Sequence, residues 1–148
     1  MALKEWYRDY ATHAFMEFSA LGYPTRETME EKIRQDINRR LAMEEPGFIV
    51  VKADAAVLER EALLQDIDAV NRVLLQLRRE NRDHIADAIR EVYFLGVGGK
   101  AKKGTLTARV RRFAYEYPAN EATVYRWLKK AREMFCEARG LCTTEERW

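Results

Sequence analysis

Apolar residues recur three or four positions apart along most of the chain, which is the spacing of side chains that share one face of an α-helix. Glycine and proline, which interrupt helices, number only 7 and 3 among 148 residues. The pattern therefore predicts an all-α fold. Helices are expected over residues 3–20, 25–44, 53–79, 83–95, 105–117 and 120–138.

Local signals mark where several of these helices begin and end. Thr25 and Asn120 are residue types that cap a helix N-terminus. Thr105 or Thr107 is expected to cap the next-to-last helix, and Pro118 is expected to end it. The chain thus carries its own start and stop signals for most of the predicted elements.

One short run departs from helical spacing. Residues 48–51, Phe-Ile-Val-Val, are rich in β-branched side chains and follow a break at Pro46 and Gly47. A single run of this kind, with no partner strand in the sequence, does not build a sheet. We interpret it as a buried connector.

The segment 53–79 carries the longest continuous helical pattern. Its apolar residues alternate between steps of four and three, as in the seam of a coiled coil. The seam lasts just over two heptads, and neighbouring apolar residues widen it, so a central core helix is favoured over a dimer seam. The seam positions are Leu63, Ile67, Val70, Leu74 and Leu77.

Charge is distributed unevenly along the chain. The formal net charge is +2, but residues 1–80 carry −3, residues 81–148 carry +5, and residues 100–132 alone carry +8. A local basic block of this kind fits a polyanionic partner. We predict an N-terminal helical region over 1–80, used for interaction or oligomerisation, and a DNA-binding unit over 81–148.

A glycine-rich basic stretch, GVGGKAKKG, occupies residues 96–104. A phosphate-binding P-loop needs Ser or Thr directly after its lysine and a strand before the loop. Here Ala101 follows Lys100, and no strand is expected upstream, so a nucleotide site is rejected. Two interpretations stay open: a basic loop beside a phosphate backbone, and a plain mobile linker.

Two consecutive segments near the C-terminus predict a pair of helices joined by a short turn. In the first, over 105–117, apolar side chains share one face and three arginines lie opposite them. The turn over 117–120 has about the length of a helix-turn-helix turn, although it lacks the glycine often found there. The residues expected to face inward are Leu106, Val110, Phe113, Ala114 and Tyr117, and those expected to face outward are Arg109, Arg111 and Arg112.

The second segment, NEATVYRWLKKAREMF, also separates apolar from basic residues. In a helix-turn-helix motif, the outward positions of its first two turns face base edges or phosphates. Arg126 there can bind a guanine edge with two hydrogen bonds, and Thr123 can contact a thymine methyl group or a phosphate. Glu121 suits the positive end of the helix dipole or, alternatively, a cytosine amine. The inward stripe is expected to contain Val124, Trp127, Leu128, Ala131, Phe135 and Ala138.

Taken alone, this helix favours DNA binding only weakly, because many surface helices carry several cations. The preceding arginine triplet, the short turn and a third helix over 83–95 together favour double-stranded DNA as the partner. The candidate DNA-binding residues are Lys100, Lys102, Lys103, Arg109, Arg111, Arg112, Asn120, Thr123, Tyr125, Arg126, Lys129 and Lys130.

Three stretches carry a resemblance to a known family: AIREVYF (88–94), TARVRRFAYE (107–116) and NEATVYRWLKKAREMFCEARGL (120–141). With them, the segment from Leu63 to Leu141 resembles the C-terminal half of the ArpU/RinA-type phage transcriptional regulators. Their DNA-binding unit is similar to region 4 of sigma factors. The resemblance implies control of phage or prophage late genes and no catalysis. The partner of the N-terminal half stays open between RNA polymerase, another phage protein and a second copy of the chain.

Other functions remain as alternatives. A small terminase-like DNA-packaging factor would form a ring of subunits, whereas a regulator is usually a monomer or a homodimer. A helical protein–protein adaptor would use the acidic N-terminal half and the aromatic helix over 3–20, and would not bind DNA.

An enzyme is the least supported class, since no nucleophile with a nearby base, metal motif or phosphate loop can be assembled. Cys136 and Cys142 are too few and too widely spaced for a metal site, so we expect reduced thiols and no cofactor or metal. The charged N-terminal segment does not match the pattern of a signal peptide, and no apolar run approaches the ~20 residues of a membrane span. A cytoplasmic protein is expected.

Overall fold

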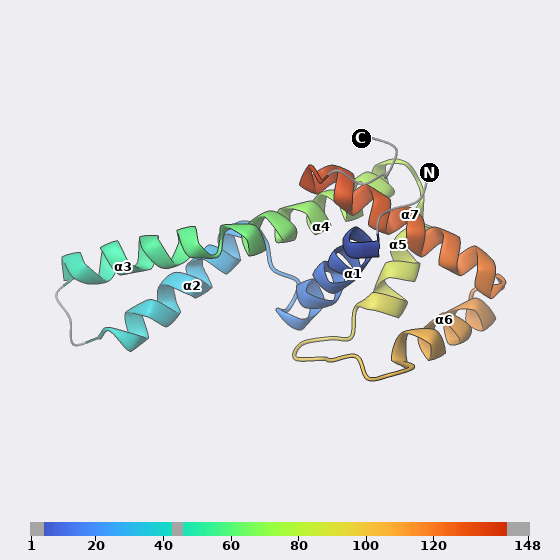
Figure 1. Cartoon of the computed structure of the whole chain (residues 1–148), viewed down its shortest axis with the longest axis horizontal. Helices are drawn as coiled ribbons and strands as arrows, with labels where there is room; N and C mark the ends of the chain where they lie inside the picture. Colours follow the sequence, from blue (N-terminus) through green and yellow to red (C-terminus); the bar gives the residue numbers. More distant parts are fainter. Residues whose placement is uncertain (1–4, 43–45, 142–148) are drawn as a thin grey trace. The chain divides into compact units, whose positions relative to one another are not determined.

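The computed structural model describes residues 5–42 and 46–141, and all regular secondary structure in these ranges is helical (Figure 1). The predicted all-α fold is therefore confirmed. The elements are α1 (Glu5–Ala20), α2 (Arg26–Arg40), α3 (Pro46–Glu59), α4 (Glu61–Arg79), α5 (Asp83–Ala88), the π-helix η1 (Ile89–Tyr93), α6 (Thr105–Glu116) and α7 (Glu121–Arg139).

The chain divides into two compact units. Unit 1 comprises Met1–Tyr23 and Ala69–Trp148, and unit 2 comprises Pro24–Asp68. The sequence suggested a division at residue 80 instead. The difference arises because α1 packs against α7 and η1, which brings an N-terminal helix into the C-terminal unit. The functional roles assigned to the regions 1–80 and 81–148 remain predictions.

Aromatic rings join α1 to the rest of unit 1. The ring of Phe15, which is fully buried, stacks on Tyr93 of η1 with centroids 5.6 Å apart, and lies 5.6 Å from the ring of Phe135 in α7. Phe18 packs at 5.6 Å from Phe94, which follows η1. Buried aromatic side chains contribute about 1.5–3 kcal/mol each by leaving water, so these contacts are a main source of the stability of unit 1.

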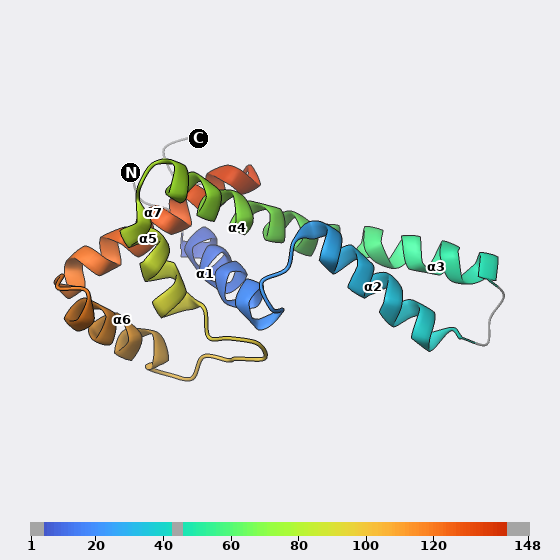
Figure 2. The same cartoon turned by 180° about the vertical axis from the view of Figure 1, so that it is seen from behind.

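Unit 2 contains a pair of helices, α2 and α3, which lie side by side in every view (Figure 2). The predicted cap of α2 is confirmed, because the backbone N–H of Thr28 donates to Oγ1 of Thr25 at 3.2 Å. The backbone N–H of Thr25 in turn donates to Oγ1 of Thr28 at 2.9 Å. Among the residues of the unit whose burial is described, the buried apolar ones are Met29, Ile33, Ala53, Val57, Leu64 and Ile67.

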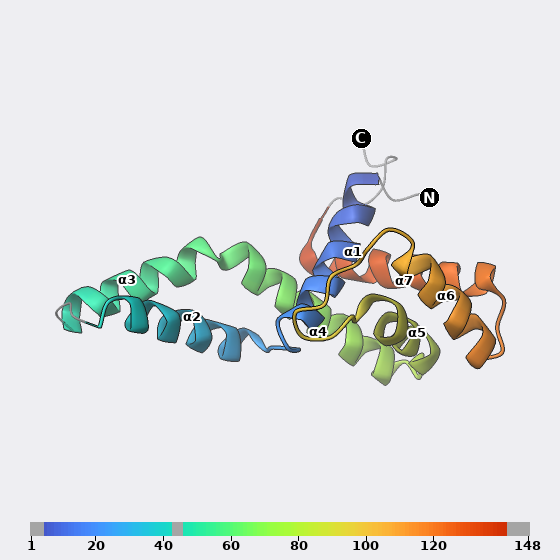
Figure 3. The same ribbon diagram turned by 90° about the horizontal axis from the view of Figure 1, so that it is seen from below.

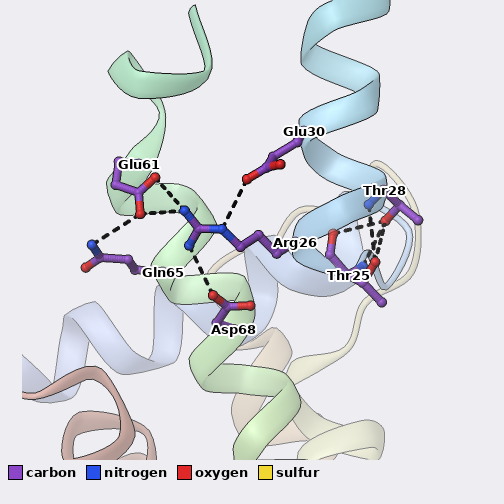
Figure 4. Close-up of polar contacts among 7 residues, drawn as sticks. All are labelled: Thr25, Arg26, Thr28, Glu30, Glu61, Gln65 and Asp68. Atoms are coloured by element: carbon purple, nitrogen blue, oxygen red, sulfur yellow. Dashed lines mark hydrogen bonds and ion pairs between the residues drawn. The ribbon is translucent and has the colours of Figure 1, made fainter. Parts of the chain in front are cut away.

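Arg26 sits among three carboxylates in unit 2 (Figure 4). Its guanidinium group donates to both carboxylate oxygens of Glu61 at 2.6 Å, and to Asp68 and Glu30 at 3.1 Å each. The hydrogen bonds to Glu61 and Asp68 raise the pKa of Arg26 above its ordinary value. Because Glu61 and Asp68 belong to α4, this cluster fastens the first turn of α2 to that helix.

The prediction for residues 48–51 was wrong. The run is helical and forms part of α3, so it is not a connector, and its residues Val50 and Val51 are 58% and 66% exposed. β-branched residues only mildly disfavour a helix, and tertiary packing overrides that preference. Here the packing of α3 along α2 decides the conformation.

The expected single helix over 53–79 is interrupted at Arg60, which separates α3 from α4. Three of the five seam positions are buried, whereas Leu63 and Leu74 are only partly covered. Leu64 and Val73, which flank the predicted seam, are fully buried. Their burial shows that the chain itself covers this stripe, as the core-helix interpretation predicted.

Candidate nucleic-acid interface

The helix α6 follows the glycine-rich loop over 95–104. Its N-cap is Gly104, whose φ of +84° is costly for any residue with a side chain. The predicted cap by Thr105 or Thr107 was wrong, because no side chain caps α6. The Oγ1 of Thr105 instead accepts a hydrogen bond from the backbone N–H of Lys102 at 3.0 Å, which closes the loop onto the helix.

The loop passes beside α1 (Figure 3), and two hydrogen bonds tie it to that helix. The backbone N–H of Leu95 donates to Oγ of Ser19 at 3.1 Å, and the backbone N–H of Gly98 donates to the carbonyl oxygen of Ala20 at 3.1 Å. The lysines that follow are exposed, and lead directly into the positive end of α6: Lys100, Lys102 and Lys103. The first half of the loop is thus anchored, and its basic half faces solvent.

The inner face of α6 is largely as predicted. Val110, Phe113 and Ala114 are buried, and Leu106 is half-buried. Tyr117 is exposed, although its ring packs against that of Phe113. The residues beyond the helix close the turn, since the backbone N–H of Ala119 donates to the carbonyl oxygen of Ala114 at 3.0 Å.

Asn120 caps α7, as predicted. Its Oδ1 accepts a hydrogen bond from the backbone N–H of Thr123 at 2.7 Å, and Glu121 occupies the first turn at the positive end of the helix dipole. At the other end, Gly140 closes the helix in the left-handed conformation with φ of +77°. Both ends of α7 are therefore fixed by local sequence.

The buried face of α7 contains four of the six predicted residues: Val124, Leu128, Ala131 and Phe135. Trp127 and Ala138 are only partly covered. Met134 and Cys136 are also buried and were not predicted. The buried face is wider than a single stripe because α7 is contacted by α1, α5 and α6.

Trp127 holds the three C-terminal helices together. Its ring centroid lies 4.8 Å from that of His84 in α5, 6.4 Å from that of Phe113 in α6, and 5.6 Å from that of Tyr117 in the turn. These edge-on contacts are favourable geometries for aromatic pairs. They fix α7 against α6 close to the turn that joins them.

The outward face of α7 is basic. Arg126, Lys129 and Lys130 are exposed, Tyr125 is exposed, and Thr123 is half-buried. The guanidinium group of Arg126 donates to Oγ1 of Thr123 at 2.9 Å. The structure therefore brings together on one helix face the candidate residues that the sequence placed there.

Two of the three arginines of α6 are exposed and face carboxylates. The Nε of Arg111 lies 3.3 Å from Oε1 of Glu121 in α7, and an Nη atom of Arg112 lies 4.0 Å from Glu91 of η1. Exposed ion pairs of this kind contribute little to stability. Both arginines are therefore accessible to a stronger anionic partner.

Arg109 was expected to face outward, and that prediction was wrong. Its guanidinium group donates to the carbonyl oxygen of Glu91 at 2.7 Å, and to that of Phe94 at 3.4 Å. Carbonyl groups at a helix end lack partners within the helix, and Arg109 supplies donors to them. The residue joins α6 to the end of η1.

The expected helix over 83–95 consists of α5 followed by η1, whose wider turns are a π-helix. Periodicity alone did not indicate this change, because the apolar positions Ile85, Ile89 and Val92 are buried in either form. π-helical turns occur mostly as short irregular pieces in α-helices. Here the π-helix directs Glu91 and the chain after Phe94 towards α6.

Two residues make the exposed surface differ from the basic block over 100–132 that the sequence indicated. Arg132 contributed to the +8 charge, but it is half-buried, and its guanidinium group donates to the phenol oxygen of Tyr93 at 2.7 Å. Tyr115, which the candidate set omitted, is 89% exposed on α6. Its position four residues after Arg111 places it on the same helix face, and this spacing was available from the sequence.

Cys136 is buried in α7, and its thiol donates to the carbonyl oxygen of Tyr7 at 3.9 Å. Burial raises the pKa of this thiol to about 11. A thiol in this state is a poor nucleophile at neutral pH. Cys142, the other predicted free thiol, lies outside the described residues.

A groove of about 790 Å³ lies between the end of α4 and α5. Its apolar lining includes Leu74 and Leu75, and its charged lining residues are Arg78, Asp83, Asp87 and Arg90. The opposite charges are equal in number, so the groove carries no bias towards an anionic ligand.

Within residues 5–42 and 46–141, no group of three or more His, Cys, Asp or Glu side chains is placed to hold a metal ion. The same part of the chain contains no helix that is both long and apolar enough to cross a membrane. Comparison of the chain with protein-family models, curated proteins and solved structures found no match.

Proposed function

We propose that this protein binds double-stranded DNA through α6 and α7, which act as a helix-turn-helix, and that it regulates transcription in a phage or prophage. The observation that carries the proposal is the division of α7 into two faces. Val124 and Leu128 are buried, whereas Arg126 and Lys129 are exposed on the first turns of the helix. A short turn joins α6 to α7, and Asn120 caps the N-terminus of α7. The resemblance to ArpU/RinA-type regulators adds late genes as the proposed targets.

In this proposal α7 is the recognition helix. The major groove of B-DNA is about 12 Å wide and admits an α-helix, so the exposed side chains of its first turns reach base edges. Arg126 reads a guanine, and Thr123 and Tyr125 lie beside it on the same end of the helix. Lys129 and Lys130, one turn further on, bind phosphates.

The remaining cations bind the DNA backbone. Arg111 and Arg112 are exposed on α6, and the lysines of the preceding loop stand at its N-terminus. Backbone N–H groups and the helix dipole make such an N-terminus favourable for phosphate. These contacts attract any duplex, so sequence preference rests on α7.

The test is fluorescence anisotropy of a labelled random-sequence duplex, titrated with protein at several salt concentrations. Each neutralised phosphate contributes about 0.9 to the slope of log affinity against log salt, so a slope of several units is expected. Replacement of Lys129 and Lys130 by alanine should lower the slope by about 2. Lys32→Ala, in an exposed position of α2, is the matched control and should leave the slope unchanged.

Operator selection from a random library follows if the duplex binds. Enrichment of one sequence, lost in Arg126→Ala, supports a regulator. Absence of binding at low salt, with the protein folded, contradicts the proposal.

The alternative of a protein–protein adaptor draws on one specific observation. Trp6 of α1 is 61% exposed, which is unusual for so large an apolar ring. An adaptor would lose partner capture in Trp6→Ala and would show no salt-dependent affinity for DNA. The packaging-factor alternative requires a ring, so its measured mass would be many times that of one chain.

A further inference from the structure

The helix α3 is apolar on two opposite faces. One face, with Ala53 and Val57, is buried in unit 2, where α3 lies along α2. The ion pair between Arg34 of α2 and Asp54 of α3 stands at the edge of that contact. The other face contains Val51 and Leu58, which are 66% and 73% exposed.

The exposed apolar residues of α3 follow a regular spacing. Val51, Ala55 and Leu58 are separated by four and three positions, so they share one side of the helix. We call these three residues the α3 stripe. Four-then-three spacing is that of the core positions of paired helices.

Unit 2 is small for a unit with its own core. It spans about 45 residues, close to the size below which domains commonly need disulfides, metals or oligomerisation. Its sequence contains no cysteine. A pair of two-helix units that bury a shared apolar face would form a four-helix arrangement, which is a common solution for such pieces.

The charges on one side of the α3 stripe are self-complementary. Lys52 and Glu59, seven positions apart, flank the stripe on the same side and are both exposed. In an antiparallel pair of identical helices, equivalent flanks face one another, so Lys52 of one copy meets Glu59 of the other, and the reverse. A two-fold interface repeats every contact in this way.

We propose that α3 is a dimerisation surface, and that the α3 stripe packs antiparallel against the α3 stripe of a second copy of this chain. The interface is isologous, with Val51 of each copy near Leu58 of the other. The proposal concerns unit 2 alone and stands independently of DNA binding, because its test measures mass in solution without nucleic acid.

The first experiment is sedimentation equilibrium of the full chain over a range of concentrations. The expected mass is twice the 17.4 kDa of one chain. Leu58→Glu should return the mass to that of the monomer, because an uncompensated charge would be buried at the seam. Val97→Glu is the matched control, since Val97 is an exposed valine in the loop of unit 1 and its variant should stay dimeric.

A charge-exchange series tests the antiparallel register. Lys52→Glu and Glu59→Lys should each weaken the dimer by opposing like charges, and the double variant should restore it. Restoration by the double variant is expected only if these two residues meet across the interface. Circular dichroism of each variant verifies that helical content is retained.

The proposal is overturned if the wild-type chain keeps the monomer mass at the highest soluble concentration. It is equally overturned if the dimer forms but Leu58→Glu, with its helices intact, leaves the mass unchanged, because association then uses another surface. A double variant weaker than both single variants contradicts the antiparallel register.

Discussion

The guanidinium group of Arg126 donates a hydrogen bond to Oγ1 of Thr123, three residues earlier on α7, at 2.9 Å. The backbone N–H of Thr123 is itself held by the cap residue Asn120. The cap therefore orients Thr123, and Thr123 orients Arg126. An arginine that is already positioned loses less conformational entropy when it binds a base edge.

Arg126→Ala should weaken binding to a selected operator by about 1–3 kcal/mol, and relax preference at one base pair. Thr123→Val should have a smaller effect, because it removes only the hydrogen bond that orients the arginine. Anisotropy with the operator and with its single-base variants measures both. Equal losses on all sequences would show that Arg126 contacts phosphate and not a base.

Trp127→Ala should lower the free energy of unfolding by about 3 kcal/mol, because the ring contacts three aromatic side chains in α5, α6 and the turn. Trp6→Ala is the matched control and should cost less than about 1 kcal/mol, since Trp6 is mostly exposed. Urea unfolding followed by circular dichroism gives both values. Similar costs for the two tryptophans would contradict the assigned role of Trp127.

Arg109 and Arg112 should give opposite results on alanine substitution. Arg109→Ala removes the donor to two carbonyl groups and should cost about 1–2 kcal/mol of stability. Arg112→Ala should leave the melting temperature unchanged and lower the salt slope of DNA binding by about 1. Thermal unfolding and anisotropy are measured on both variants. A stability loss in Arg112→Ala alone would reverse these assignments.

Arg26→Ala should destabilise the fold by about 1–2 kcal/mol, because it leaves Glu30, Glu61 and Asp68 without the cation they share. Arg40→Ala, at the exposed end of the same helix, should cost only a few tenths of a kcal/mol. Salt should reduce the difference between the variants. Identical melting temperatures at low salt would show that the cluster contributes nothing.

Cys136 makes stability depend on pH in the alkaline range. Its thiol has a pKa of about 11 in the folded protein, against an ordinary value of 9.0. Between these values the unfolded chain binds fewer protons than the folded chain, so the free energy of unfolding falls as pH rises. The loss should approach about 2–3 kcal/mol by pH 11 and be absent below pH 9.

Cys136→Ala should remove this part of the pH dependence while tyrosine ionisation affects both proteins alike. Urea midpoints at pH 8 and at pH 11 provide the comparison. Equal falls in the wild type and the variant would mean that the thiol does not stay protonated on folding.

Local signals allowed much of the C-terminal arrangement to be predicted. Asn120 caps α7 because its own side chain reaches a backbone N–H three residues on, and this requires no distant partner. The inward position of Val124 and Leu128 follows from spacing along the same helix. Features decided within one or two helical turns are thus visible in the sequence.

Features decided by distant contacts could not be predicted. The helical state of Val50 and Val51 depends on packing of α3 along α2, and the orientation of Arg109 depends on carbonyl groups of η1. The membership of α1 in unit 1 rests on rings such as Phe15 and Phe135, which are far apart in the chain. The spacing of apolar residues predicts which face of a helix is buried, but it does not predict which other helix covers that face.

That last contact has a consequence for folding. Because α1 meets α7 across almost the whole length of the chain, the long intervening segment must close before these two helices cover each other. Contacts between residues so distant in sequence slow folding, and α1 must wait for α7 during synthesis. Until then the aromatic face of α1 stays open to water, and α7 lacks one of the three helices that pack against it.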